Sequence, residues 1–135
     1  KISKNDIFLC NCDVIIEANF GAIYNFHKKR KNDLTIVASA KNYEIPYGIC
    51  HLDKKGNLKK IVEKPKNKLF VNTGLYILKP KVLNLIPKNH FFHMTELIEK
   101  AKKKKLSVGV YPINDSDWID TGEMSTYLKN IHFAG

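Results

Sequence analysis

The chain has 135 residues, of which 44% are hydrophobic and 27% charged, a balance typical of one globular domain. No apolar run approaches the roughly 20 residues of a membrane-spanning helix, and no secretory signal opens the chain, so we expect a cytoplasmic protein without a membrane partner. The net charge of +10 comes almost entirely from lysine, with Arg30 as the only arginine, which argues against specific nucleic-acid contacts and favours attraction to small phosphorylated substrates.

The first part of the chain alternates between strands and a helix. Residues 7–16 (IFLCNCDVII) are apolar except near Asp13 and predict a central strand covered on both faces. Residues 19–31 carry apolar side chains at helical spacing and end in HKKRK, which predicts an amphipathic helix with cations at its C-terminal end. Residues 34–40 (LTIVASA) are rich in β-branched side chains and predict another strand.

A hairpin is predicted in the middle of the chain, where ICHL and LKKIV flank the turn sequence DKKGN. Residues 70–78 predict a strand, followed by a helix that begins at Pro80 and contains VLNLI. Residues 95–105 predict a second helix capped by Thr95, residues 107–113 a strand, and the segment from near Gly122 a last helix. This order indicates an α/β layered domain with a mixed, mainly parallel sheet.

The three cysteines are Cys10, Cys12 and Cys50. Their odd number indicates reduced thiols in a cytosolic setting. Cys10 and Cys12 resemble half of a metal site, but no second cysteine or histidine pair follows at a spacing suited to zinc. We therefore expect buried cysteines on strands.

Two carboxylates stand where strands give way to turns or helices. Asp13 follows the first apolar run, and Asp120 lies in WIDTG before the last predicted helix. Taken singly, each is best explained as a helix cap. If the two strand ends are neighbours, both side chains could face one Mg²⁺ ion, which binds a few carboxylates and completes its shell with water and phosphate oxygens.

Polar residues also interrupt or precede the apolar run at 70–78. Glu63 and Lys64 place a carboxylate acceptor beside an ammonium donor, although composition alone favours an ordinary exposed turn. Asn72 offers an amide that both donates and accepts, and Gly74 allows a ligand or backbone to approach closely.

Five short motifs occur in order along the chain: Asn11-Cys12-Asp13, Pro46-Tyr47-Gly48, Glu63-Lys64-Pro65, VNTGLYIL at 71–78, and Trp118-Ile119-Asp120-Thr121-Gly122. Their order and spacing resemble the sugar-1-phosphate nucleotidylyltransferase family, such as glucose-1-phosphate thymidylyltransferase and mannose-1-phosphate guanylyltransferase. The resemblance extends from about Ile7 to Lys129. It implies a Rossmann-like nucleotidyltransferase fold, and an enzyme that transfers a nucleotidyl group from a nucleoside triphosphate to a sugar 1-phosphate, giving an NDP-sugar and pyrophosphate.

The resemblance also implies roles for single residues. Asp13 and Asp120 would be ligands of Mg²⁺ and, with Lys64, the catalytic residues. Glu63 would accept sugar hydroxyls, and Lys64 would neutralise the sugar phosphate. The backbone at Tyr47 and Gly48 would line the sugar pocket, and its other side would be closed by Asn72, Thr73 and Gly74.

The chain departs from the family pattern in two places. Cys12 stands where the family usually has glycine, and no glycine-rich G-x-G-T-R-like loop for the triphosphate occurs in the 135 residues. We therefore expect residues 1–135 to form a single domain, the C-terminal sugar-binding portion of a nucleotidyltransferase domain whose N-terminal part is missing, inactive by itself. The alternatives are a non-catalytic regulatory module that binds sugar phosphates and, from charge alone, a basic nucleic-acid-binding domain. A homo-oligomer formed by pairing of a truncated sheet edge stays open.

Overall fold

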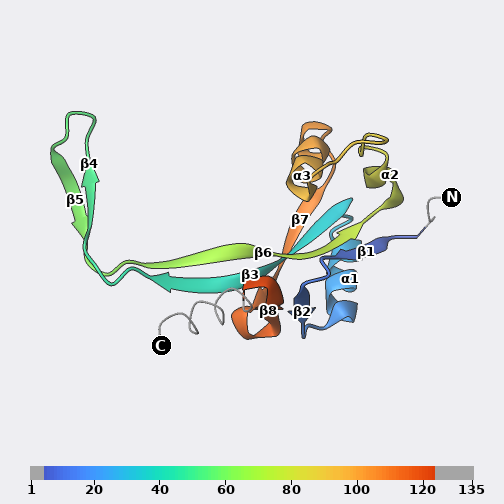
Figure 1. The fold of residues 1–135 in the computed structure, drawn as a ribbon, viewed down its shortest axis with the longest axis horizontal. Coiled ribbons are helices and arrows are strands. Elements are labelled where there is room, and N and C mark those ends of the chain that lie inside the picture. Colours follow the sequence, from blue (N-terminus) through green and yellow to red (C-terminus); the bar gives the residue numbers. More distant parts are fainter. Residues whose placement is uncertain (1–4, 124–135) are drawn as a thin grey trace.

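The computed structural model describes residues 5–123. A four-stranded sheet in the order β1-β6-β3-β7 forms the body, and two small two-stranded sheets pair β2 with β8 and β4 with β5 (Figure 1). The strands are β1 (Ile7–Cys10), β2 (Val14–Ile16), β3 (Leu34–Glu44), β4 (Ile49–Leu52), β5 (Leu58–Val62), β6 (Lys66–Leu78), β7 (Val108–Asn114) and β8 (Trp118–Asp120). The helices are α1 (Phe20–Lys29), α2 (Pro80–Leu83), α3 (Met94–Lys103) and the 3-10 turn η1 (Asp115–Asp117).

The mixed sheet flanked by helices is confirmed, but its balance of directions differs from the expectation of a mainly parallel sheet. Among the described strands only β3 and β7 pair in parallel, whereas β6 runs antiparallel to both β1 and β3. The reason is that the chain passes from β3 through the β4–β5 hairpin and returns as β6. A chain that turns back through a hairpin pairs its legs antiparallel.

The single strand predicted over residues 7–16 is wrong. The chain turns at residues 11–13, so β1 pairs with β6 while β2 pairs separately with β8. In the described part of the chain β1 is an edge strand, and its Phe8 and Leu9 side chains are 42% and 43% exposed. The expectation of buried cysteines is also wrong, because Cys10, Cys12 and Cys50 are all exposed.

The other predicted elements are present with shifted ends. Helix α1 begins at Phe20 and is capped by Asn19, whose side chain accepts the Ala22 N–H at 2.9 Å. Helix α3 is capped at His93 rather than Thr95, and the His93 N–H donates to the Glu96 carboxylate at 2.8 Å. Helix α2 is shorter than predicted. Residues 121–123 are helical, and the rest of the helix predicted from near Gly122 lies outside the described residues.

The hydrophobic core lies on both faces of the four-stranded sheet, because successive side chains of a strand point to opposite faces. One face packs against α1, and its buried members are Ile23, Val37, Leu75, Ile77 and Ile113. The other face packs against α2 and α3, and its buried members are Leu34, Tyr76, Leu78, Val82 and Leu97. No helix among the described residues is long and apolar enough to cross a membrane.

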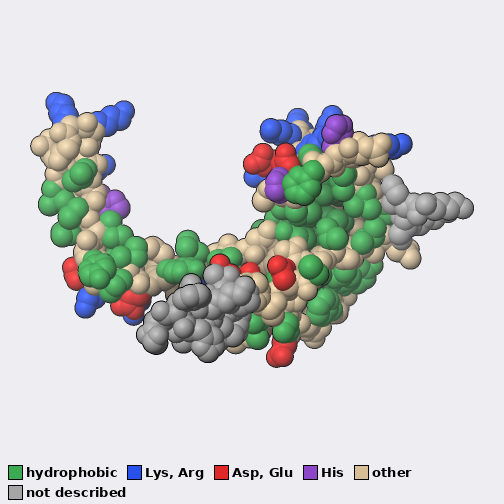
Figure 2. Space-filling view, viewed as in Figure 1, with side chains coloured by type: hydrophobic (Ala, Val, Ile, Leu, Met, Phe, Trp, Pro, Cys, Tyr) green, Lys and Arg blue, Asp and Glu red, His purple; other side chains and the backbone are tan. Residues whose placement is uncertain are grey.

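Strands β3 and β6 continue past the core as a two-stranded arm, with the β4–β5 hairpin at its far end (Figure 1). The side chains of residues 66–70 on this arm are exposed, including Leu69 at 50% and Phe70 at 57%. On the face shown in Figure 2, lysines gather at the tip of the hairpin and again around α3, at opposite ends of the molecule. Because the side chains of residues 66–70 are exposed, the arm has no hydrophobic core of its own within the described residues.

A fully buried histidine joins α1 to the sheet. Nδ1 of His27 lies 2.8 Å from the Thr35 hydroxyl, and Nε2 lies 3.8 Å from a carboxylate oxygen of Asp6. Nε2 has no hydrogen-bond partner among the described residues. Burial lowers the pKa of His27 below its ordinary value of 6.5, because it outweighs the opposing charge of Asp6; Lys79 and Lys28 lower it further, and Asp33 opposes them.

This pKa predicts an acid-sensitive fold. Above pH 6.5, His27 is neutral in both the folded and the unfolded chain. Below pH 6.5, His27 binds a proton in the unfolded chain more readily than in the folded chain, because its pKa is lower in the folded state. The free energy of unfolding therefore falls as the pH falls. We expect His27→Gln to flatten the decrease in the free energy of unfolding below pH 6.5 in urea titrations. Burial raises the pKa of Asp33, but hydrogen bonds from Lys81 and Lys79 bring it below 3.8. Protonation of Asp33 therefore lowers the free energy of unfolding only in stronger acid than protonation of His27 does. An unchanged slope in His27→Gln would contradict the prediction.

Candidate functional site

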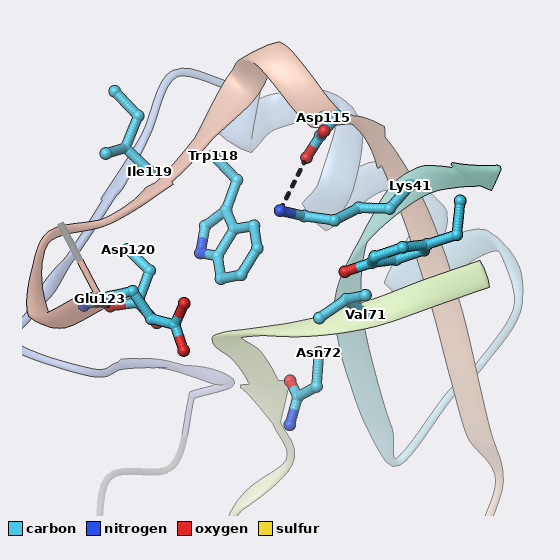
Figure 3. A pocket seen from close by; sticks show the side chains of 9 residues that line it. Lys41, Val71, Asn72, Asp115, Trp118, Ile119, Asp120 and Glu123 are labelled. Atoms are coloured by element: carbon cyan, nitrogen blue, oxygen red, sulfur yellow. Dashed lines mark hydrogen bonds and ion pairs between the residues drawn. The ribbon is translucent and has the colours of Figure 1, made fainter. Parts of the chain in front are cut away.

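A cleft of about 660 Å³ lies where β3 and β6 face the segment from η1 through β8 (Figure 3). It is lined by Lys41, Tyr43, Val71, Asn72, Asp115, Trp118, Ile119, Asp120 and Glu123. Of the residues predicted to form the site, Asn72 and Asp120 lie in its wall. The cleft is open, and both polar and apolar side chains line it.

Pairing of β2 with β8 brings Asp13 and Asp120 together. Val14 pairs with Asp120, and the Thr121 backbone N–H and hydroxyl both donate to the Asp13 carbonyl, at 2.9 and 2.8 Å. A Cβ on Gly122 would lie 3.3 Å from Asp120 Oδ1 and 3.4 Å from Asp13 Oδ2. The two carboxylates therefore border one gap that the glycine keeps open.

Asp120 also caps the helical turn that follows it. Its Oδ1 accepts the N–H groups of Gly122 at 3.0 Å and Glu123 at 3.2 Å. These bonds fix the orientation of the Asp120 carboxylate beside the gap. The cap uses Oδ1, the oxygen nearest the gap, so an ion bound by Asp120 would be held through its other carboxylate oxygen, Oδ2.

The donor set at this gap fits Mg²⁺. Two carboxylate oxygens border a space about the size of one methyl group, and Mg²⁺ prefers oxygen ligands. No cluster of three or more metal-ligating side chains occurs in the described part of the chain. Mg²⁺ often binds through one or two carboxylates and takes its remaining ligands from water and substrate phosphates, so two carboxylates are enough for a site of this kind.

The polar interruption of β6 is largely explained by local structure. The buried Thr73 hydroxyl donates to the Val37 carbonyl at 2.9 Å, near the point where the register of β3 and β6 shifts. Gly74 has φ of +83°, and a Cβ there would lie 2.8 Å from the Asn11 side chain. Asn72 donates to the Tyr76 hydroxyl at 2.6 Å. Of these three residues, only Asn72 lines the cleft.

The remaining predicted residues lie together at the base of the β4–β5 hairpin. A Cβ on Gly48 would lie 2.9 Å from Glu63 Oε2, Tyr47 is 74% exposed, and Lys64 has φ of +42°. Because a strand rises about 3.3 Å per residue, even Lys66 at the start of β6 lies about 20 Å from Asn72. The structure thus divides the predicted site residues into a body group near the cleft and an arm group.

Sequence reasoning missed several residues of the cleft. Nζ of Lys41 lies 3.3 Å from Asp115 Oδ1 and 4.8 Å from the centroid of the Trp118 ring. The indole Nε1 of Trp118 is buried and finds no acceptor among the described residues. The available signal was the alternation of Ser39, Lys41 and Tyr43, which continues the strand beyond the apolar run and places all three on one face.

Comparison with known proteins identifies the family. The family model for nucleotidyl transferases matches residues 1–134. The chain belongs to the nucleotidyl transferase family. This confirms the family expected from the order of the five motifs.

The named relatives are longer than the chain. It is 33% identical to mannose-1-phosphate guanyltransferase 2 of Candida glabrata, over 95% of the chain and 37% of that protein. It is 31% identical to probable mannose-1-phosphate guanylyltransferase 2 of Oryza sativa subsp. japonica, over 96% of the chain and 36% of that protein. The chain therefore spans little more than a third of the length of these curated relatives.

Solved structures show the same fold. HddC from Yersinia pseudotuberculosis superposes with a TM-score of 0.59 at 21% identity, over 92% of the chain and 53% of that structure. A putative glucose-1-phosphate thymidylyltransferase from Bacillus anthracis, in complex with sucrose, superposes with a TM-score of 0.60 at 15% identity, over 90% of the chain and 51% of that structure. The predicted Rossmann-like nucleotidyltransferase fold is thereby confirmed.

Proposed function

We propose that this protein transfers a nucleotidyl group from a nucleoside triphosphate to a sugar 1-phosphate, giving an NDP-sugar and pyrophosphate. The observation that carries the proposal is the gap at Gly122, bordered by the carboxylates of Asp13 and Asp120 beside the cleft. Membership of the nucleotidyl transferase family supports the reaction type. The names of the curated relatives, mannose-1-phosphate guanylyltransferases, support the class of substrate.

The proposed reaction is an in-line displacement at phosphorus. An oxygen of the sugar phosphate forms a bond to the α-phosphorus of the triphosphate, while the bond from that phosphorus to the oxygen bridging to the β-phosphate breaks. Pyrophosphate leaves with the electron pair. Catalysis of this kind consists mainly of positioning the reactants and neutralising their charge.

Asp13 and Asp120 would hold Mg²⁺ at the gap beside Gly122. When bound there, Mg²⁺ would offset the negative charge on the phosphate oxygens. The hydrogen bonds from Gly122 and Glu123 keep the Asp120 carboxylate directed at this place before any substrate arrives. Asn72, on the opposite wall of the cleft, would contact the substrate through its side-chain amide.

Tyr47, Gly48, Glu63 and Lys64 are the proposed sugar-binding residues of the arm, with Lys64 also serving in catalysis. The close approach of Gly48 to Glu63 supports one shared site at the base of the hairpin. For this arm group and the cleft to contact one substrate, the arm has to bend toward the body. The exposed side chains of residues 66–70 support such bending, because a segment without buried apolar contacts resists deformation only weakly.

The proposal is tested by expressing these 135 residues within a polypeptide that also carries a glycine-rich triphosphate loop. The polypeptide is mixed with Mg²⁺, nucleoside triphosphates and either mannose 1-phosphate or glucose 1-phosphate, and the products are followed by phosphorus NMR. We expect pyrophosphate and an NDP-sugar in equal amounts, and neither product from the 135-residue chain alone. Binding of the sugar phosphate without either product in the longer polypeptide would favour the regulatory module.

A further inference from the structure

One lysine of the cleft has no part in the proposed reaction. Lys41, on β3, is the only cationic side chain among the described residues that line the cleft. The carboxylates of Asp115, Asp120 and Glu123 also line it. A phosphorylated ligand that enters this cleft therefore meets a single fixed positive charge, and that charge belongs to Lys41 rather than to Lys64 on the arm.

The Lys41 ammonium is held on two sides. Asp115 Oδ1 lies 3.3 Å from its Nζ, and the same oxygen accepts the Ser39 hydroxyl at 3.1 Å. The indole ring of Trp118 lies against the ammonium on another side, with 4.8 Å from Nζ to the ring centroid. The Lys41 side chain is 30% exposed. Restraining the ammonium before a ligand arrives reduces the entropy lost on binding.

Two side chains with hydrogen-bond donors, Lys41 and Trp118, line this wall of the cleft. An ammonium carries three N–H donors, and the ion pair with Asp115 engages one of them. The Trp118 Nε1–H is buried without an acceptor in the described part of the chain. Figure 3 shows this nitrogen on the side of the ring that faces Asp120 and Glu123. A buried donor without a partner is costly, and a ligand oxygen would satisfy it.

We propose that Lys41 is a substrate-binding residue. Its ammonium donates a hydrogen bond to a negatively charged phosphate oxygen of a sugar 1-phosphate. This inference rests on the proposed function and adds to it the group that recognises the phosphate inside the cleft. The competing explanation is a structural ion pair between β3 and η1. A structural pair of this exposure contributes little to stability and leaves ligand binding unchanged.

The test is isothermal titration calorimetry of the 135-residue chain with mannose 1-phosphate in the presence of Mg²⁺. The variants are Lys41→Met, Lys41→Arg and the control Lys66→Met. Lys66 forms a comparable ion pair, 3.6 Å from Glu44, on the exposed arm outside the cleft. We expect Lys41→Met to raise Kd by about 10- to 100-fold, as loss of a hydrogen bond between charged groups does. Lys41→Arg retains most of the affinity, and Lys66→Met binds like the wild type.

Three results would overturn the inference, and they differ in what they imply. Wild-type affinity in Lys41→Met, together with lost binding in Asp120→Asn, removes the role of Lys41 and leaves the proposed function intact. Equal weakening in Lys41→Met and Lys66→Met shows that the loss of one positive charge anywhere on the chain weakens binding, and that Lys41 has no specific contact with the ligand. If the wild-type chain binds neither mannose 1-phosphate, glucose 1-phosphate nor inorganic phosphate, the inference fails, whereas the proposed function is still decided by product formation in the longer polypeptide.

Discussion

Asp120→Asn is expected to remove the Mg²⁺-dependent binding of sugar 1-phosphate while leaving the stability of the chain nearly unchanged. Asparagine caps a helix about as well as aspartate, so the free energy of unfolding should change by less than about 0.5 kcal/mol. The charge that faces the gap beside Gly122 is lost. Because even outer partners of metal ligands affect metal affinity by about 10- to 100-fold, loss of a ligand should weaken Mg²⁺-dependent binding by at least about 100-fold.

The matched control for this variant is Asp117→Asn. Asp117 also accepts backbone and side-chain N–H groups, from Asn114 at 3.2 and 3.0 Å, but it lies outside the lining of the cleft. Asp117→Asn should therefore bind like the wild type in the presence of Mg²⁺. Equal binding by Asp120→Asn and the wild type, both folded by circular dichroism, would rule out the role of Asp120 as a metal ligand.

Gly74→Ala is expected to destabilise the fold by about 3 kcal/mol, the largest effect on stability that we predict. Two causes add. Gly74 has φ of +83°, which alanine adopts only with strain, and the new Cβ would lie 2.8 Å from the Asn11 side chain. Asn11 cannot withdraw freely, because its backbone N–H donates to the Gly74 carbonyl at 3.0 Å. Urea unfolding followed by circular dichroism measures the loss.

Gly56→Ala separates these two causes. Gly56 has nearly the same φ, +87°, but nothing lies within 4 Å of a Cβ built there. This variant should therefore lose only the conformational part, about 1 kcal/mol. The double variant Asn11→Ala with Gly74→Ala should recover part of the larger loss, as a double-mutant cycle detects. Equal losses in Gly74→Ala and Gly56→Ala would show that the contact with Asn11 has no energetic role.

The sequence predicted the features that depend on local pattern and on motif order. The family follows from five motifs in sequence, and helix α1 and the β4–β5 hairpin follow from periodicity and turn residues. The condition that two strand ends be neighbours is met by the pairing of β2 with β8, which places Asp13 beside Asp120. That these two residues bind Mg²⁺ stays a prediction.

Features that depend on pairing between distant segments of the chain could not be predicted from the sequence. The side chains at the far end of β3 and β6 are exposed and mix polar with apolar residues, so no regular apolar pattern marked the length of the arm. The wall of the cleft joins Ser39 to Asp115, which lie 76 positions apart, and no spacing rule connects them. Similarly, an apolar run shows that a segment forms a strand but not how many neighbours it has, which is why β1 was misplaced at the centre of the sheet.

The most direct test of the site uses Trp118, the only tryptophan of the chain and part of the cleft wall. Its fluorescence is followed while mannose 1-phosphate is added to the wild-type chain, once with Mg²⁺ and once with a chelator. If Asp13, Asp120 and the cleft form one substrate site, the fluorescence changes to saturation with Mg²⁺, and the apparent affinity falls sharply in the chelator. A titration that gives no saturable change, or the same curve with and without Mg²⁺, would contradict the account.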